Sequence, residues 1–335
     1  MMLFDSLSDK PRAALYGLFI GDALAMPVHW YYDPLNIESD FGRIRDYQAP
    51  KSVHPESILW RSHYRSLNKR GEILHDQAKY WGQQGVHYHQ FLQAGENTLN
   101  LQLCWLQWQS MLAMGGWNRA DYLKRYVEFM TTPGRHRDTY LEESHRGFFT
   151  RYAKGMAPEK CSVPEKHVGG LAALFPCLVW YDDDLETGKR CALERMLATH
   201  KGDLMQDAAQ LMVKLYAVVA RGVSIRDAAQ DLIDSQCSAL LKGNWRKWLE
   251  LPTREVLTRR IGTVCYVQAA VPAIFYLLLK HGDQPEAALV ENTMAGGDNA
   301  YRGAVLGALL GRAHGMQAWP TRWVKGLRLA AAPEG

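Results

Sequence analysis

Residues 296–315 read GGDNAYRGAVLGALLGRAHG, and glycine recurs there at every fourth position, 303, 307, 311 and 315. On an α-helix this spacing places the glycines on one face and leaves a strip of bare backbone. Glycine inside a helix costs roughly 1 kcal/mol relative to alanine, so a run of four needs an offsetting benefit. Residues 13–26 carry the same spacing at Gly17 and Gly21. We therefore predict that both segments are helices that approach other helices closely in a packed core.

The apolar residues elsewhere also show helical rather than strand-like spacing. Helix start signals are visible at four points, and about ten or more helices are expected in all. These signals are Asn118 before 119–130, Asp203 before 204–221, Ser224, and Pro285 before 286–294. We predict an all-α fold, a compact single domain over 1–335. Residues 41–93 have weak periodicity and many Arg, His, Ser, Gly and aromatic residues, so we expect a lid or insertion there.

Composition narrows the class of protein. Hydrophobic residues make up 47% of the 335 residues and charged residues 22%, which is typical of a globular protein. The 39 basic and 35 acidic residues are too balanced to indicate nucleic-acid binding. Six scattered cysteines without a CxxC pair, and an N-terminus without a signal peptide, favour a cytoplasmic protein with reduced thiols. The uncharged stretch 261–279 is interpreted as a buried core helix rather than a membrane span.

Two short segments share an unusual pattern, in which glycine, an acid and asparagine stand before a predicted helix. The first is Gly95-Glu96-Asn97-Thr98, ahead of 99–114, and the second is Gly296-Gly297-Asp298-Asn299. Asn, Asp and Thr cap helix N-termini, and the helix dipole stabilises an acid there. Simple capping explains either segment alone. For the pair we favour a shared polar site, with Glu96 and Asp298 as its acids.

Several other side chains are candidates with a structural alternative. Asp22 lies in a strongly apolar helix, where it is either a cap for a neighbouring helix or part of a site. His29 is either a packed ring among aromatic residues or a general base. His87 and His89 flank the first segment and could line the same cavity. The Gly169 and Gly170 pair after His167 could present backbone amides to a phosphate or ribose, although the spacing matches no nucleotide-binding fingerprint.

The order of these motifs resembles the ADP-ribosylglycohydrolase family, the group that includes dinitrogenase-reductase activating glycohydrolase. The resemblance runs from about Arg12 to Gly315. It rests on Gly21-Asp22-Ala23-Leu24, on the segment around Glu96, on Thr199-His200 opening a long helix, and on the segment around Asp298. The resemblance implies a compact all-α domain with a cleft for two Mg²⁺ ions. It also implies cleavage of the glycosidic bond at C1″ of ADP-ribose on a modified side chain.

The departures from the family pattern fall at the metal motifs. The family has Thr-Asp-Asp-Thr where this chain has residues 95–98, and Gly-Gly-Asp-Thr-Asp-Thr where it has Gly296-Gly297-Asp298-Asn299-Ala300-Tyr301. An acidic position of the family aligns with His29. Because Mg²⁺ prefers several oxygen ligands, mainly carboxylates, we expect at most one weakly held ion, bound by Glu96, Asn97 and Asp298. Asn97 and Asn299 can instead donate hydrogen bonds to sugar or phosphate groups.

We therefore expect a hydrolase that acts on an N- or O-glycosidic bond of an ADP-ribosyl or related ribosyl substrate. Glu96 and Asp298 would be the acid and base, and His29 would assist a water molecule. The expected ligand-binding residues are Asn97, Asn299, Asp22, Gly169, Gly170 and His167. The partner would be an ADP-ribose-type small molecule or an ADP-ribosylated protein, with no nucleic acid or membrane. Two alternatives stay open: a catalytically silent member that binds such a ligand or serves a structural role, and a hydrolase with another substrate such as a nucleoside.

Overall fold

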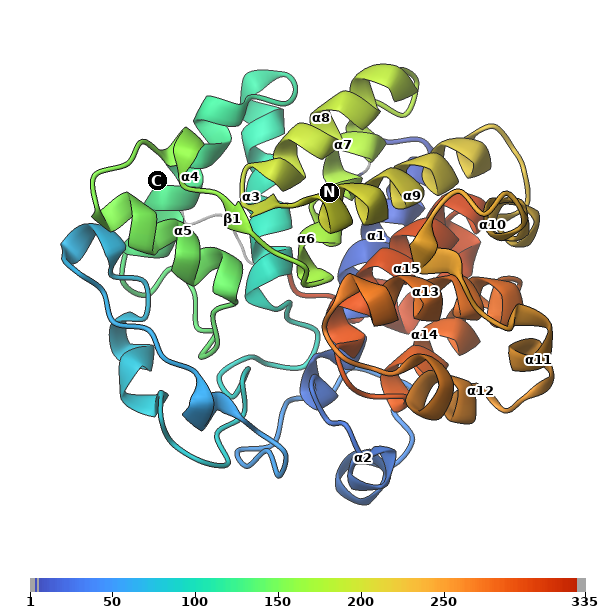
Figure 1. The fold of residues 1–335 in the computed structure, drawn as a ribbon, viewed down its shortest axis with the longest axis horizontal. Helices are drawn as coiled ribbons and strands as arrows, with labels where there is room; N and C mark the ends of the chain where they lie inside the picture. The colour runs from blue at the N-terminus through green and yellow to red at the C-terminus, as the bar shows by residue number, and fades with distance from the viewer. Residues whose placement is uncertain (1–3, 5, 330–335) are drawn as a thin grey trace.

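The computed structural model describes residue 4 and residues 6–329, and α-helices make up most of this part of the chain (Figure 1). The helices of the first half are α1 (Asp9–Ala25), α2 (Pro34–Phe41), α3 (Leu99–Met114), α4 (Arg119–Thr131), α5 (Glu143–Ala153), α6 (Gly169–Ala172), α7 (Phe175–Trp180) and α8 (Leu185–Leu197). Those of the second half are α9 (Asp203–Ala220), α10 (Ile225–Asp234), α11 (Trp245–Glu250), α12 (Thr253–Glu255), α13 (Val267–His281), α14 (Pro285–Met294), α15 (Asn299–His314) and α16 (Thr321–Gly326). Strands β1 (Val163–Pro164) and β2 (His200–Lys201) form one short parallel pair. The predicted all-α class is confirmed.

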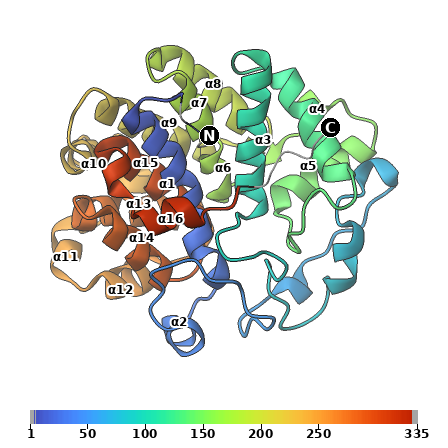
Figure 2. The ribbon, with the colours of Figure 1, turned by 180° about the vertical axis from the view of Figure 1, so that it is seen from behind.

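The glycine-spaced helices α1 and α15 pack directly against each other, and they lie side by side in both views (Figures 1 and 2). A Cβ on Gly17 would lie 2.1 Å from the carbonyl oxygen of Gly307, and a Cβ on Gly21 would lie 2.0 Å from that of Gly303. No other residue type allows so close an approach of two backbones. The predicted reason for the glycine strip is therefore confirmed. Gly315 is an exception, because it follows the end of α15 with φ +76° and ends the helix.

The buried apolar side chains form two groups, and α3 contributes to both. Leu101 and Trp108 of α3 belong to the large core that also contains α1, α7, α9, α13 and α15. Leu99 and Leu103 belong to a smaller core with α4, α5 and residues 73–74. Because successive turns of α3 face both cores, the start of this helix is held between the two halves of the structure.

Local start signals were accurate where a side chain caps its own helix. Asn118 accepts a hydrogen bond from the amide of Asp121 at the start of α4, and Ser224 does the same for Asp227 at the start of α10. Pro285 is the first residue of α14, as predicted. Asp203 lies inside the first turn of α9, because Gly202 is the N-cap residue. The predictions based on Asn118, Ser224 and Pro285 are confirmed, and the cap assigned to Asp203 is wrong by one position.

Three predicted helices have different limits for physical reasons. The apolar run 171–180 after the Gly169 and Gly170 pair, which the sequence predicts as one helix, is divided into α6 and α7, because Pro176 has no backbone N–H for a helical hydrogen bond. Thr199-His200 does not open α9, since His200 pairs with Val163 between β2 and β1. The expected helix over 261–279 begins at Val267, after a π-helical turn that ends at Gly262 with φ +95°. Among the described residues, no helix is long and apolar enough to cross a membrane.

Residues 42–98 connect α2 to α3 without an α-helix. They contain three short 3₁₀ turns, at Leu59–Arg61, Lys69–Gly71 and His75–Tyr80, and an antiparallel bridge between Val53 and Val86. Figure 1 shows this segment along the left and lower edges of the molecule, beside and below α5. A lid or insertion over 41–93 within one domain stays a prediction.

Candidate active site

The head of α3 is held by a carboxylate from another helix. Asp22 of α1 accepts hydrogen bonds from the Thr98 amide at 2.9 Å, from the Thr98 hydroxyl at 2.7 Å and from Nδ2 of Asn97 at 2.8 Å. Burial raises the pKa of Asp22 to about 6, although these hydrogen bonds oppose the shift. The structure therefore supports the capping role for Asp22. Neither Thr98 nor Asp298, the N-cap residues of α3 and α15, uses its own side chain as a cap.

A continuous row of hydrogen bonds joins the two helix heads through the protein interior. The Leu99 amide at the start of α3 donates to Oδ2 of Asp138 at 2.6 Å, and the other oxygen of Asp138 bonds Nδ1 of His89. Nε2 of His89 lies 2.8 Å from Nδ1 of His29. Nε2 of His29 then lies 3.2 Å from Oδ1 of Asp298 at the head of α15. The row thus connects the two helix heads through Asp138 and two histidines, and Glu96 takes no part in it.

The number of hydrogen bonds in this row fixes the number of protons that it holds. The three hydrogen bonds from Asp298 to Asp138 need three protons, whereas two neutral imidazoles carry only two. Burial lowers the pKa of His29 well below its usual value, so His29 is neutral. The row therefore holds one proton more than two neutral imidazoles supply, and His29 does not carry it. With both nitrogens of His29 engaged, its ring positions Asp298 in the described conformation.

Asp298 is fully buried, and only one of its carboxylate oxygens has a hydrogen-bond partner among the described residues. Burial raises its pKa to about 7, and the positive charges of His167 and Arg302 oppose this rise. Arg302 is itself buried, and its guanidinium donates to the side chain of Asn292 and to the carbonyl of Gly296. This arginine supplies positive charge beside Asp298 without a direct ion pair.

A second buried acid, Glu142, was missed by the sequence analysis. It precedes α5, and its Oε2 accepts a hydrogen bond from Nδ2 of Asn100 at 2.7 Å. Its other oxygen has no partner among the described residues. Burial raises the pKa of Glu142 to about 7, and the negative charge of Asp298 contributes to the rise. In the sequence, an acid before a helix looks like an ordinary cap, so no local signal separates Glu142 from a structural residue.

His167 lies near Glu142 and Asp298 and forms its own hydrogen-bonded group with Glu165 and Cys265. Its Nδ1 bonds Glu165, whose Oε1 also accepts the Lys166 amide. Burial lowers the pKa of His167, but hydrogen bonds with Cys265 and Glu165 and the charge of Glu142 outweigh this effect and raise it to about 12. His167 is therefore a cation close to the two carboxyl groups.

Gly169 and Gly170 are packed against side chains rather than facing an open space. A Cβ on Gly169 would lie 2.3 Å from Nδ2 of Asn100, and a Cβ on Gly170 would lie 2.7 Å from the ring of His200. The four-residue helix α6 starts here. This close packing explains why glycine is needed at both positions, independently of any ligand.

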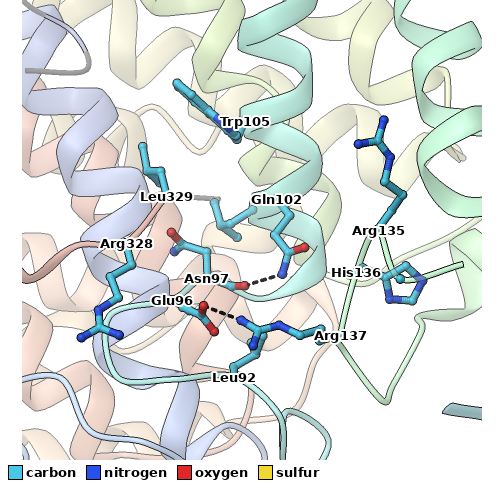
Figure 3. Close-up of a pocket in the computed structure, with 12 residues that line it drawn as sticks. Leu92, Glu96, Asn97, Gln102, Trp105, Arg135, His136, Arg137, Arg328 and Leu329 are labelled. Carbon is cyan, nitrogen blue, oxygen red and sulfur yellow. Dashed lines mark hydrogen bonds and ion pairs between the residues drawn. The ribbon is translucent and has the colours of Figure 1, made fainter. Parts of the chain in front are cut away.

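Glu96 does not join the row of hydrogen bonds that ends at Asp298. Its side chain is paired with Arg137 and also accepts a hydrogen bond from the Gln93 amide, on the wall of a separate pocket (Figure 3).

The side-chain amide nitrogens of Asn97 and Asn299 donate hydrogen bonds to backbone carbonyls, and that of Asn299 lies 2.9 Å from the Thr293 carbonyl oxygen. The Oδ1 atoms of both asparagines are buried without a partner among the described residues. Nε2 of His87 donates a hydrogen bond to the Pro27 carbonyl at 3.0 Å, and its Nδ1 accepts from the His89 amide at 3.0 Å.

The residues at the family's metal motifs do not fit a pair of Mg²⁺ ions. Glu96 is engaged with Arg137, His29 occupies one oxygen of Asp298, and position 300 is alanine. Mg²⁺ requires near-octahedral oxygen coordination, which one free carboxylate oxygen cannot supply. A different group, Glu143, Glu165 and His167, has ligand atoms within 4.8 Å of one another. His167 holds a proton strongly there, and this opposes metal binding because a ligand imidazole must be neutral.

Comparison with known proteins agrees with the fold and with the family that the sequence resembles. The ADP-ribosylglycohydrolase family model matches residues 4–333. A solved structure named "ADP-ribosylglycohydrolase-related protein complex" is similar, with a TM-score of 0.63 and 19% identity over 96% of this chain and 93% of that chain. At this identity the likeness shows a shared fold. No protein of curated function matches the sequence. The family match over nearly the whole length shows that this chain belongs to the ADP-ribosylglycohydrolase family.

Proposed function

We propose that this protein is a hydrolase that cleaves an N- or O-glycosidic bond of an ADP-ribosyl or related ribosyl substrate, with a reduced or absent di-metal site. Membership of the family supports the reaction class. The observation that carries the proposal is the pair of buried acids Glu142 and Asp298. Each has one carboxylate oxygen without a hydrogen-bond partner among the described residues. Two such carboxyl groups are the minimum that glycosidic cleavage needs.

The environments of the two acids favour different protonation states. Each acid has a pKa raised to about 7. Near neutral pH, a state with one proton shared between the two carboxyl groups is therefore favoured over the state in which both are ionised. The positive charges of His167 and Arg302 favour the ionised form of Asp298. The charge of Asp298 in turn disfavours ionisation of Glu142. We assign Glu142 as the acid that protonates the leaving group, and Asp298 as the carboxylate that activates water or stabilises the cationic transition state.

The other predicted residues take supporting roles in this proposal. His29 orients Asp298, since both of its ring nitrogens are engaged. Asn299 keeps a ligand-binding role, which is supported by its buried Oδ1 without a partner among the described residues. His167 supplies positive charge near the two acids. Glu96 is left out of the catalytic pair because Arg137 neutralises it on another surface. The substrate remains an ADP-ribose-type molecule or an ADP-ribosylated protein.

The proposal is tested by hydrolysis assays on the full chain with a panel of N-linked and O-linked ADP-ribosyl compounds. Released ADP-ribose is quantified by chromatography, with and without EDTA. We expect turnover that survives EDTA and falls at least 100-fold in Glu142→Gln and in Asp298→Asn, since a positioned acid or base contributes about that much. Glu186→Gln, an exposed glutamate in the first turn of α8, is the matched control. Wild-type turnover that both variants retain would disprove the assignment.

Burial of the pair supports a second candidate, a catalytically silent member that binds a ligand. Asp298 has no exposed surface and Glu142 is 3% exposed, so a substrate reaches them only after the surrounding chain moves. Titration calorimetry with ADP-ribose separates the candidates. Tight binding without turnover of any compound in the panel would favour the silent candidate, and turnover would exclude it.

A further inference from the structure

A pocket at the head of α3 lies apart from Glu142 and Asp298. Its walls come from three segments: residues 92–105, residues 134–137, and Arg328 with Leu329 (Figure 3). The volume is about 120 Å³, several times the roughly 30 Å³ that one water molecule occupies in the liquid. None of the residues in the row from Asp298 to Asp138 lines this pocket. A ligand here would therefore occupy a site separate from the two buried acids.

The lining of this pocket carries excess positive charge. It contains three arginines, Arg135, Arg137 and Arg328, and one acid, Glu96, which gives a net charge of +2. Burial lowers the pKa of His136, so that ring adds no charge. Figure 3 shows the Arg137 guanidinium turned toward Glu96, with Arg328 on the other side of this acid in the view. Arg328 forms no ion pair with any carboxylate of the described residues, so none of these carboxylates neutralises its charge.

Three residues that line the pocket also keep buried polar atoms without a hydrogen-bond partner among the described residues. These atoms are Oδ1 of Asn97, Nε1 of Trp105 and Nδ1 of His136. Asn97 is 4% exposed and His136 is 5% exposed. Nε2 of His136 bonds the Ile73 carbonyl and must donate to it, so Nδ1 is an acceptor. The set therefore consists of two acceptors and one donor, and leaving such groups unpaired is unfavourable.

The charges and the unpaired atoms complement one kind of small molecule. Arginine guanidinium groups recognise phosphate oxygens through charge-assisted hydrogen bonds. Polar side chains of the lining, such as Asn97 and Gln102, can form hydrogen bonds with hydroxyl groups, which a sugar offers in abundance. We propose that this pocket binds a phosphate monoester of a small sugar, with the phosphate at Arg328 and Arg137 and the sugar beside Asn97 and Gln102 of the lining.

Substitution of Glu96 distinguishes phosphate recognition by this pocket from damage to the fold. Its carboxylate holds Arg137 and competes with an incoming phosphate for that guanidinium. Replacing Glu96 by glutamine removes the competing charge and keeps the size of the side chain. Binding of a phosphate ester must therefore become tighter in Glu96→Gln and weaker in Arg328→Gln. Damage to the fold cannot explain an increase in affinity, so the pair of variants separates recognition from structural effects.

The test is titration calorimetry of the full chain with ribose 5-phosphate, inorganic phosphate and ribose as probes. We expect one ribose 5-phosphate per chain, bound about tenfold more weakly by Arg328→Gln and severalfold more tightly by Glu96→Gln. Arg190→Gln removes the same charge from the exposed surface of α8 and should bind like the wild type. Inorganic phosphate and ribose should each bind more weakly than the ester.

Three outcomes would overturn the proposal: no saturable binding of ribose 5-phosphate, an equal loss in Arg190→Gln, or no gain in Glu96→Gln. Equal affinities for inorganic phosphate and for the ester would overturn the sugar part. Asp298→Asn should leave this binding unchanged. The pocket is thereby tested independently of the proposed glycosidic cleavage, and either proposal can fail alone.

Discussion

Nε2 of His29 lies 3.2 Å from Oδ1 of Asp298, although the two residues are 269 positions apart in the sequence. Both side chains are fully buried. His29 follows the end of α1 and Asp298 precedes α15, so the close packing of these two helices at Gly17, Gly21, Gly303 and Gly307 brings the side chains together. The contact that orients the proposed catalytic carboxylate is thus a direct consequence of the glycine strip.

Removing the ring of His29 should destabilise the protein. In His29→Ala, Asp298 and His89 each lose a buried partner, and the free energy of unfolding should fall by about 3 kcal/mol. Urea unfolding of His63→Ala, which removes an exposed ring, provides the control and should differ from the wild type by less than about 0.5 kcal/mol. Equal stability of the two variants would show that the hydrogen-bonded row contributes nothing.

The capping role of Asp22 predicts a local effect on α3. Asp22→Ala leaves the Thr98 amide, the Thr98 hydroxyl and Nδ2 of Asn97 without this acceptor, and the loss should cost about 3 kcal/mol. Amide hydrogen exchange at residues 98–101 should become faster than in the wild type. Asp231→Ala, on the exposed face of α10, should change neither measurement. Unchanged exchange at the start of α3 in Asp22→Ala would contradict the capping role.

Buried Glu142 makes stability depend on pH with a definite sign. Its pKa is raised from 4.5 to about 7 on folding, so between these values the folded chain holds a proton that the unfolded chain releases. The contribution of Glu142 to stability is therefore present below about pH 4.5 and decreases as the pH rises toward 7, by roughly 3 kcal/mol in total. Glu142→Gln removes this pH-dependent contribution to the free energy of unfolding.

The measurement is urea unfolding of the wild type and of Glu142→Gln at pH 5 and at pH 8. The variant should gain stability relative to the wild type on going from pH 5 to pH 8. Glu186→Gln, which lacks a buried environment, should follow the wild type at both values. A difference between wild type and Glu142→Gln that is independent of pH would show that Glu142 titrates normally.

The contact between α1 and α15 should not accept even one methyl group. In Gly307→Ala the new Cβ would lie 2.1 Å from the carbonyl oxygen of Gly17, and the helices must separate. We expect a loss of about 3 kcal/mol or more, because overpacking in a core is costly. Gly155→Ala is a useful comparison, since φ is +89° there but nothing lies within 4 Å of the new Cβ. Backbone strain alone should cost about 1 kcal/mol at that position, and thermal unfolding distinguishes the two effects.

Removal of divalent cations should have little effect. Because Arg137 engages Glu96 and His29 engages Asp298, EDTA treatment should leave the unfolding midpoint unchanged. Calorimetry with Mg²⁺ should show no stoichiometric binding. Binding of two Mg²⁺ ions per chain, lost in Asp298→Asn, would restore the metal centre that the family resemblance implies and would contradict the metal-poor site.

Much of the fold follows from signals within short stretches of sequence. The limits of α3 match the predicted 99–114, Asn118 and Ser224 cap their helices, and the glycine spacing predicts that α1 and α15 each approach another helix closely. Each of these features depends on residues within a few turns of one another, where backbone geometry and hydrogen bonding are local. For the same reason the sequence located both helix heads and singled out Asp22, His29 and Asp298.

The partners of those side chains depend on tertiary structure. Glu142 and Asp138 have no motif around them, and they become notable because the fold buries them beside Asp298 and His89. Glu96 looked equivalent to Asp298 in the sequence, yet Arg137 draws it to a different surface. The sequence by itself determined the helices, the helix heads and the family. Only the tertiary structure decided which acids share a site, because desolvation and charge pairing depend on neighbours that are distant in the chain.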